Sequence, residues 1–225
     1  MNTHNINHIG SSQPALPTSR TAPEQERGVL AVLRSLAPRR HLSHREAYML
    51  AELQANRLLE LAGLPQAPIP NELITELPRI MVHRDPDLPV SGSAHWASGR
   101  WQLNVNASEP WTRQRFSLAH EFKHCIDHRH IAVLYTDAST AEAAADYFAA
   151  CLLMPKRLVK RHWGEGTQSV SALARVFAVS PVAMARRLEH LGLRSLPSRP
   201  TSQRDFGRRG HYTRTFTTPS LGAAA

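Results

Sequence analysis

Residues 116–124, Phe-Ser-Leu-Ala-His-Glu-Phe-Lys-His, restrict the possible folds more than any other stretch of the sequence. Around them, apolar residues recur at spacings of three, three and four: Phe116, Ala119, Phe122 and Ile126. This periodicity predicts a helix that is buried along one side. Ser108 is the expected N-cap, and Pro110 suits the first helical turn, where its missing N–H costs nothing. The rest of the chain must therefore pack around a long helix that starts near residue 108.

The same helix places metal-binding side chains on a second face. His120 and His124 lie one turn apart, close enough for both imidazoles to bind one metal ion. Glu121 lies about 100° around the helix axis from His120, where its carboxylate could deprotonate a metal-bound water without being a ligand. Zinc peptidases use this His-Glu-x-x-His (HEXXH) pattern to generate a hydroxide at neutral pH. The alternative is chance spacing, because the chain contains 13 histidines.

A third metal ligand is needed, and Glu142 is the strongest candidate. It lies in a second predicted helix, an alanine-rich stretch that begins at Ser139 and stops near Pro155. Two interpretations stay open from the residues alone. Glu142 either closes a capping box with Ser139, which spacing slightly favours, or is the third ligand. Asp146, one turn later, would then be a hydrogen-bond partner for a ligating histidine.

Two histidines beyond His124 rank below Glu142 as the third ligand. His128 shares the face of His120 and His124, but eight helical residues span ~12 Å, which is too far for one ion. His130 has the offset of a metzincin third histidine, yet Asp127 occupies the position where that pattern needs a turn-forming glycine.

Length, charge and cysteine content limit the functions that the chain can have. A chain of 225 residues can bury one sizeable core with room left for tails. The net charge of +9 falls mainly in those tails, with +3 in residues 1–40 and +5 in residues 194–225. We expect solvated tails, with non-specific polyanion contact as the lesser alternative. Cys125 and Cys151 do not make a secreted disulfide framework and are interpreted as small buried residues.

No stretch of the sequence indicates a membrane or secretory segment. None approaches the ~18 apolar residues of a membrane span. Residues 1–20 lack the apolar core of a secretory signal. We therefore predict a cytoplasmic protein with no membrane partner.

Shorter elements are predicted on both sides of the metal-binding helices. Before them, helices are expected at 24–36, 43–62 and 71–77. Strand-like runs are expected at 80–82, 90–96 and 101–106, with a hairpin turn at 97–100. The edge of this small antiparallel sheet either binds an extended peptide or only covers the core. Residues 171–193 indicate two short helices of helix-turn-helix-like order, in which Arg186 and Arg187 could contact phosphate; plain packing is the favoured interpretation and DNA contact the weaker one.

Two separated motifs resemble the ImmA/IrrE family of metallo-endopeptidases. The first runs from Arg115 to His124, and the second runs from Glu142 through Ala150 into Leu152-Leu153-Met154-Pro155. The resemblance extends to Ser91-Gly92 and to residues 101–106, and it covers roughly residues 45–193. It implies a zincin-like, gluzincin-type α+β fold. In that fold a small antiparallel sheet packs on an active-site helix and a third-ligand helix, followed by the helix-turn-helix-like pair.

The resemblance also implies a role for each site residue. His120, His124 and Glu142 would bind one zinc ion per chain, with manganese as the alternative metal, and Glu121 would be the catalytic base. Family members typically cleave a helix-turn-helix repressor, which derepresses genes. Two residues depart from the family pattern. Lys123 replaces a common glycine and must find a route to solvent, and Asp146 stands where asparagine is common.

The leading hypothesis is a zinc-dependent endopeptidase that cleaves a repressor-type transcriptional regulator. The alternative is a DNA- or protein-binding regulator, or a toxin-antitoxin partner, with a structural or inactive metal site. Four side chains could stabilise the oxyanion, with no preference among them: Tyr147, Tyr135, His95 and His128. The expected segments are a largely disordered N-terminal segment at 1–40, the peptidase domain at 41–165, the helical appendage at 166–193 and a disordered basic tail at 194–225.

Overall fold

A computed structural model describes residues 28–64 and 66–193 of the chain. In chain order its elements are α2 (Val29–Ser35), α3 (His44–Ala62), α4 (Glu72–Thr75), β1 (Ile80–Asp85), β2 (Gly92–Ala97), β3 (Arg100–Asn106), α5 (Trp111–Asp127), α6 (Ile131–Leu134), α7 (Ala138–Leu153), α8 (Lys156–Gly164), α9 (Val170–Phe177) and α10 (Pro181–His190). The mixed α+β class predicted from the sequence is confirmed. Most of the predicted 1–40 segment and all of the 194–225 tail lie outside the described residues.

The three strands form one mixed sheet in the order β1-β3-β2. β2 and β3 form the predicted antiparallel hairpin, in which Gly92 pairs with Val105. Its two-residue turn has a positive φ at both Ser98 and Gly99, as a type I′ hairpin turn requires. β1 pairs in parallel with β3, however, so the prediction of a purely antiparallel sheet was wrong. The chain between β1 and β2 crosses to the far side of β3 instead of turning back on itself.

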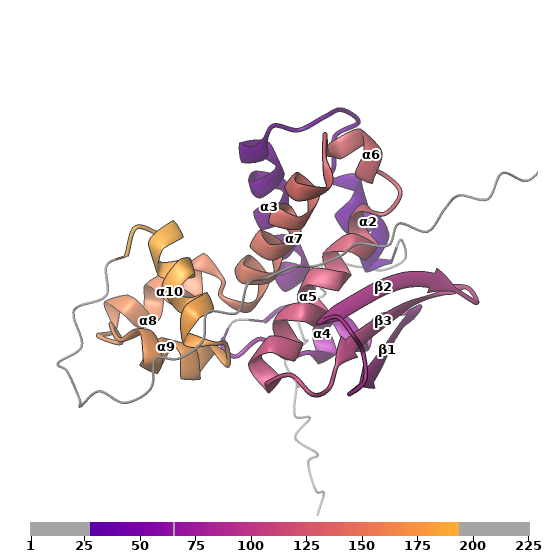
Figure 1. Cartoon of the computed structure of the whole chain (residues 1–225). Helices are drawn as coiled ribbons and strands as arrows, with labels where there is room; N and C mark the ends of the chain where they lie inside the picture. The colour runs from indigo at the N-terminus through magenta and orange to yellow at the C-terminus, as the bar shows by residue number, and fades with distance from the viewer. Residues whose placement is uncertain (1–27, 65, 194–225) are drawn as a thin grey trace, which may run out of the picture.

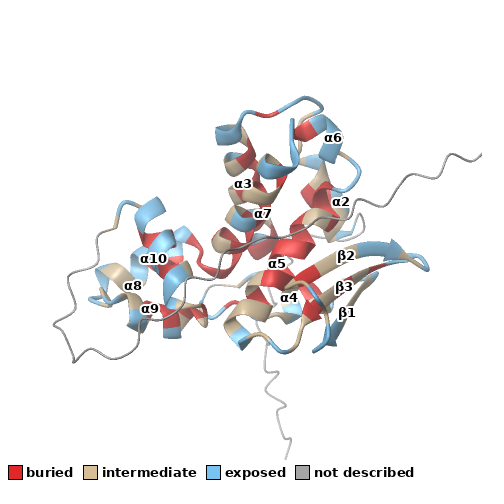
Figure 2. Cartoon of the chain, viewed as in Figure 1, coloured by how far each residue is buried: buried red, intermediate tan, exposed pale blue. Residues whose placement is uncertain are grey.

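Helix α5 lies between the sheet and the helices α3 and α7 (Figure 1). On β3, the buried residues alternate with more exposed ones and face this helix: Trp101, Leu103 and Val105. They join Phe122, Ile126 and Phe148 in the main core. Figure 2 shows how strongly burial is concentrated along α5. The helix that carries the motif is therefore the centre of the fold, and it is buried on more than the one side that its apolar periodicity predicted.

The start of α5 differs from the prediction in one detail. The N-cap position is occupied by Pro110, whose carbonyl accepts from the Arg113 and Gln114 N–H groups at 2.8 and 3.0 Å. Ser108 does not cap the helix. Its hydroxyl instead donates to Asn106 Oδ1 at 2.6 Å, because this short side chain bonds more readily within the turn that follows β3.

The C-terminal helices α8, α9 and α10 gather on the side away from the sheet (Figure 1). Arg115 on α5 holds the end of α9 by donating to the carbonyls of Phe177 and Ala178. Arg187, considered above as a phosphate contact, is 1% exposed, and its Nε donates to the Met154 carbonyl at 3.0 Å. Its guanidinium also lies over the Tyr147 ring. Of the two predicted basic contacts, Arg186 alone is exposed. Among the described helices, none has both the length and the apolar character needed to cross a membrane.

Candidate metal centre

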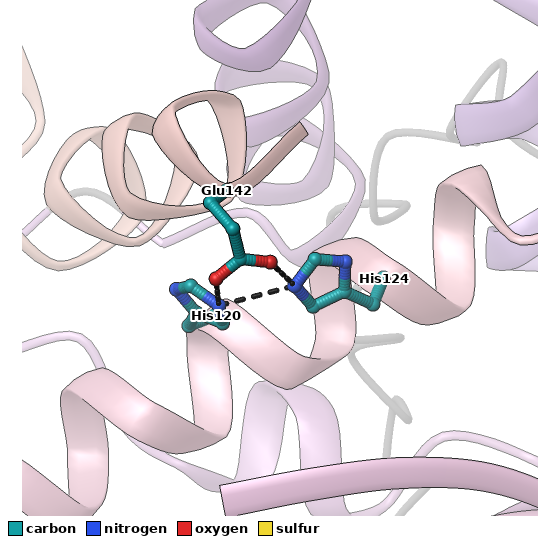
Figure 3. Close-up of side chains that lie close together, drawn as sticks. All are labelled: His120, His124 and Glu142. Carbon is teal, nitrogen blue, oxygen red and sulfur yellow. Dashed lines mark hydrogen bonds and ion pairs between the residues drawn. The ribbon is translucent and has the colours of Figure 1, made fainter. Parts of the chain in front are cut away.

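Three side chains from two helices converge on one point (Figure 3). His120 and His124 on α5 bring their Nε2 atoms within 3.1 Å of each other. Glu142 on α7 completes the cluster, with its two carboxylate oxygens 3.3 Å from His120 Nε2 and 3.0 Å from His124 Nε2. Two helices that are separated in the chain by α6 therefore present two nitrogens and a carboxylate to a common centre.

The spacing of these atoms fits a tetrahedral metal ion. Ligand atoms bonded to zinc at ~2.0–2.1 Å in tetrahedral geometry lie roughly 3.3–3.4 Å from one another. The three observed separations, 3.0, 3.1 and 3.3 Å, are close to that value. Two imidazoles with one carboxylate are also a donor set that zinc accepts. The residues could therefore hold the metal with little movement.

Asp146 orients one of the two imidazoles. Its Oδ1 lies 2.7 Å from His120 Nδ1, so the ring is held with Nδ1–H donating to the carboxylate. That hydrogen bond leaves the Nε2 lone pair directed at the cluster. The partner role predicted for Asp146 from its position one turn after Glu142 agrees with this geometry.

Glu142 is not a helix cap. Helix α7 begins two residues earlier than Ser139 would require, and its N-cap is Asp137, whose Oδ1 accepts from the Thr140 N–H at 2.7 Å. Asp137 is as good a capping residue as serine, which is why spacing alone pointed to the wrong cap. Burial pushes the Glu142 pKa upward, but the contacts of its carboxylate with the His120 and His124 side chains outweigh burial and lower the pKa to about 2. The carboxylate is thus ionised at neutral pH.

Glu121 is buried beside the cluster and does not belong to it. Its side chain lies against Gly92 on β2, where an added Cβ would be 2.9 Å from Glu121 Cγ. No role of its own was predicted for Gly92 from the sequence. An isolated glycine inside a strand is the signal that could have shown it, because such a residue often marks a close approach of the backbone.

The four oxyanion candidates lie outside the His-His-Glu cluster. The Tyr135 hydroxyl is bonded to Asp127 and Lys123. The Tyr147 hydroxyl donates to Glu52, and the His128 ring packs edge-on against Trp101. His95 is exposed on β2 at a position that alternation places on the opposite face from Gly92.

Lys123 does not reach solvent, contrary to the prediction. It is 1% exposed, its Nζ pairs with Asp127, and it lies 3.1 Å from the Tyr135 hydroxyl, which itself donates to Asp127 at 2.6 Å. Burial lowers the pKa of Lys123, and Asp127 opposes that shift. The sequence could not show this because the partner Tyr135 lies beyond the end of α5. The hydrogen bonds of Tyr135 to this ion pair join the last turns of α5 to the segment that leads into α7.

Residues 78–189 match the family model described as the IrrE N-terminal-like domain (Peptidase_M78). The chain belongs to the ImmA/IrrE family. The matched range of this ImmA/IrrE-family chain contains the whole sheet and both helices of the cluster. Among solved structures, a Mycobacterium tuberculosis transcriptional regulator is similar at 20% identity and a TM-score of 0.48, over 62% of this chain and 46% of that chain. No curated protein matches the chain.

Proposed function

We propose that this ImmA/IrrE-family chain is a zinc-dependent endopeptidase that hydrolyses a peptide bond in a protein substrate. The observation that carries the proposal is the convergence of His120, His124 and Glu142 beside the buried Glu121. Among the described residues the cluster has three ligand groups, which leaves a fourth tetrahedral position for the reaction. Structural zinc sites fill all four positions with protein ligands. The arrangement thus favours a catalytic over a structural site.

Each residue of the site has a separate role in the proposed hydrolysis. Zinc, when bound, would polarise the scissile carbonyl and lower the pKa of water to ~7. Glu121 accepts the proton from the attacking water and passes it to the leaving amine. His120, His124 and Glu142 hold the metal, and Asp146 keeps His120 in the tautomer that binds it. Manganese at the same donors is the alternative metal.

Strand β2 is the surface on which an extended peptide would lie. The order β1-β3-β2 leaves one edge of β2 without a strand partner among the described residues. This edge runs past Glu121, because Gly92 begins β2 and lies against that side chain. Backbone hydrogen bonds to an edge strand can align a peptide without restricting its sequence. From family membership, we propose a helix-turn-helix repressor as the substrate.

The test compares metal content and cleavage in four purified proteins: wild type, Glu121→Gln, His124→Ala and His130→Ala. The substrate is the repressor-like protein encoded nearest in the genome, and products are identified by mass spectrometry. Wild type and His130→Ala should each bind one metal ion per chain and cut the substrate at one position. Glu121→Gln should keep the metal and lose cleavage. His124→Ala should lose both, since it lacks a proposed ligand.

Three results would reject the proposal. Equal metal content in His124→Ala and wild type would show that the cluster is not the metal site. Undiminished cleavage by Glu121→Gln would remove the proposed base. If every variant binds the regulator or its operator DNA equally well and none cuts, the alternative of a binding regulator with an inactive metal site replaces it.

A further inference from the structure

A second candidate site lies near the C-terminal end of α5. A cavity of about 480 Å³ opens there between the start of α2, the segment that leads into β1, and the tip of the β2–β3 hairpin. The lining contains no member of the His-His-Glu cluster. Its volume falls in the range of ~300–1,000 Å³ that small-molecule sites occupy. The proposed peptidase activity assigns no role to this cavity.

One wall of the cavity is a row of three rings. Trp101 is almost fully buried and meets Trp96 edge-on at 5.5 Å and His128 edge-on at 4.9 Å between ring centroids. Trp96 itself is 48% exposed. A buried indole therefore fixes a half-exposed one at the cavity wall. A fixed, exposed indole offers a flat surface on which a planar ligand can stack.

The charged residues of the lining are all cationic. Arg34, Arg79 and Arg129 line the cavity, and no aspartate or glutamate does. Arg34 is held in place because it donates to the carbonyls of Cys125 and Ile126 at the end of α5. Arg79 and Arg129 are exposed, and within residues 28–64 and 66–193 neither guanidinium has a carboxylate partner. Three positive charges thus surround the aromatic wall, and no acidic side chain lines the cavity beside them.

Nearby His128 responds to the same charges. Burial, followed by the positive charges of Arg34 and Arg129, lowers the pKa of its imidazole. A cationic ligand would meet the same repulsion. A purely apolar ligand would leave the arginines unpaired while covering them, which costs free energy. The lining therefore favours a ligand that is flat and negatively charged.

We propose that this cavity binds a small planar anion with the size and chemistry of a mononucleotide. Its ring stacks on Trp96, and its phosphate pairs with Arg79 and Arg129. Arginine suits this role because its planar guanidinium can donate two parallel hydrogen bonds to a phosphate. The bound anion would also lie against Arg34, which contacts the last turn of the helix that carries His120 and His124.

The test is calorimetric titration of the full chain with AMP, and separately with adenosine and inorganic phosphate. Two variants change the proposed contacts, Trp96→Ala and Arg129→Gln. Two matched controls change equivalent groups outside the cavity: Trp111→Ala, where the indole is 54% exposed, and Arg100→Gln, an exposed arginine of the same hairpin. None of the four changes touches the cluster or Glu121.

AMP should bind wild type at one site per chain, and it should bind more tightly than adenosine or inorganic phosphate does. Trp96→Ala should weaken binding at least about fivefold, the lower end of what base–aromatic stacking contributes. Arg129→Gln should also weaken it, while both controls stay within about twofold of wild type. Absence of saturable AMP binding to folded wild type would overturn the proposal. So would equal weakening by Arg100→Gln, which would indicate diffuse charge attraction, or binding of single-stranded oligonucleotide without binding of AMP.

Discussion

Gly92 on β2 and Glu121 on α5 are in direct contact, and the absence of a side chain at residue 92 makes that contact possible. A Cβ at this position would lie 2.9 Å from Glu121 Cγ and 3.0 Å from Glu121 Oε1. The same Cβ would lie 3.3 Å from the Asn104 carbonyl oxygen, which is also a close contact. Strand and helix therefore set the position of the proposed catalytic base together.

Gly92→Ala should displace the Glu121 carboxylate while leaving the metal ligands in place. Misplacing a reacting group by ~1 Å can cost roughly 10²-fold in rate. We expect the cleavage rate to fall by at least about tenfold, with one metal ion per chain retained. Substrate cleavage and metal content should be measured together. Gly164→Ala is the matched control, because a Cβ there meets no atom within 4 Å. Full activity in Gly92→Ala would show that Glu121 tolerates the shift.

Asp146 should control metal affinity through His120. Asp146→Ala removes the hydrogen bond to His120 Nδ1 and frees the ring to rotate or change tautomer. Loss of such a partner typically weakens metal binding about 10–100-fold. Asp146→Asn retains an acceptor oxygen and should cost much less. Competition with a chromogenic chelator measures both variants. Equal affinities in Asp146→Ala and wild type would mean that the neighbouring structure alone orients the imidazole.

The sequence predicted the central helices well because several signals agreed there. The apolar spacing around Phe122 and the helix expected at 43–62 rest on local patterns, and both are found in the structure. The position of β1 is different in kind. Each strand run is too short to specify its partner, and a parallel pairing with β3 depends on the whole fold. Local sequence patterns therefore predicted the helices and strands, whereas the order of the strands in the sheet could be seen only in the structure.

The same distinction holds at the site. Two ligands one turn apart are visible in any helix, so His120 and His124 could be paired from spacing. Glu142 required either the family resemblance or the structure, because spacing alone slightly favoured a capping box with Ser139. Gly92 and Tyr135 were missed as partners of Glu121 and Lys123. Each contact joins segments whose proximity only tertiary packing determines.

Removing one partner of the buried Lys123–Asp127 pair should destabilise the fold more than replacing the whole group with apolar side chains. Lys123→Met would leave the Asp127 carboxylate buried without its cation, which typically costs ~3–5 kcal/mol. Replacing all three groups, as Lys123→Met with Asp127→Leu and Tyr135→Phe, should recover most of that loss, since apolar groups need no partners. Urea unfolding followed by circular dichroism measures both. Lys160→Met changes an exposed lysine and should have little effect. A mild effect of Lys123→Met alone would mean that water reaches Asp127.

Cys125 and Cys151 should resist alkylation in the folded protein. Both are free thiols with almost no exposed surface. Burial raises the Cys125 pKa well above its usual range and raises the Cys151 pKa to about 11. Since the thiolate is the reactive form and a raised pKa keeps the thiol protonated, neither should react with iodoacetamide at about pH 8. In denaturant both should react quickly at the same pH. Mass spectrometry counts the added groups, and fast labelling of the native protein would show that α5 or α7 opens readily.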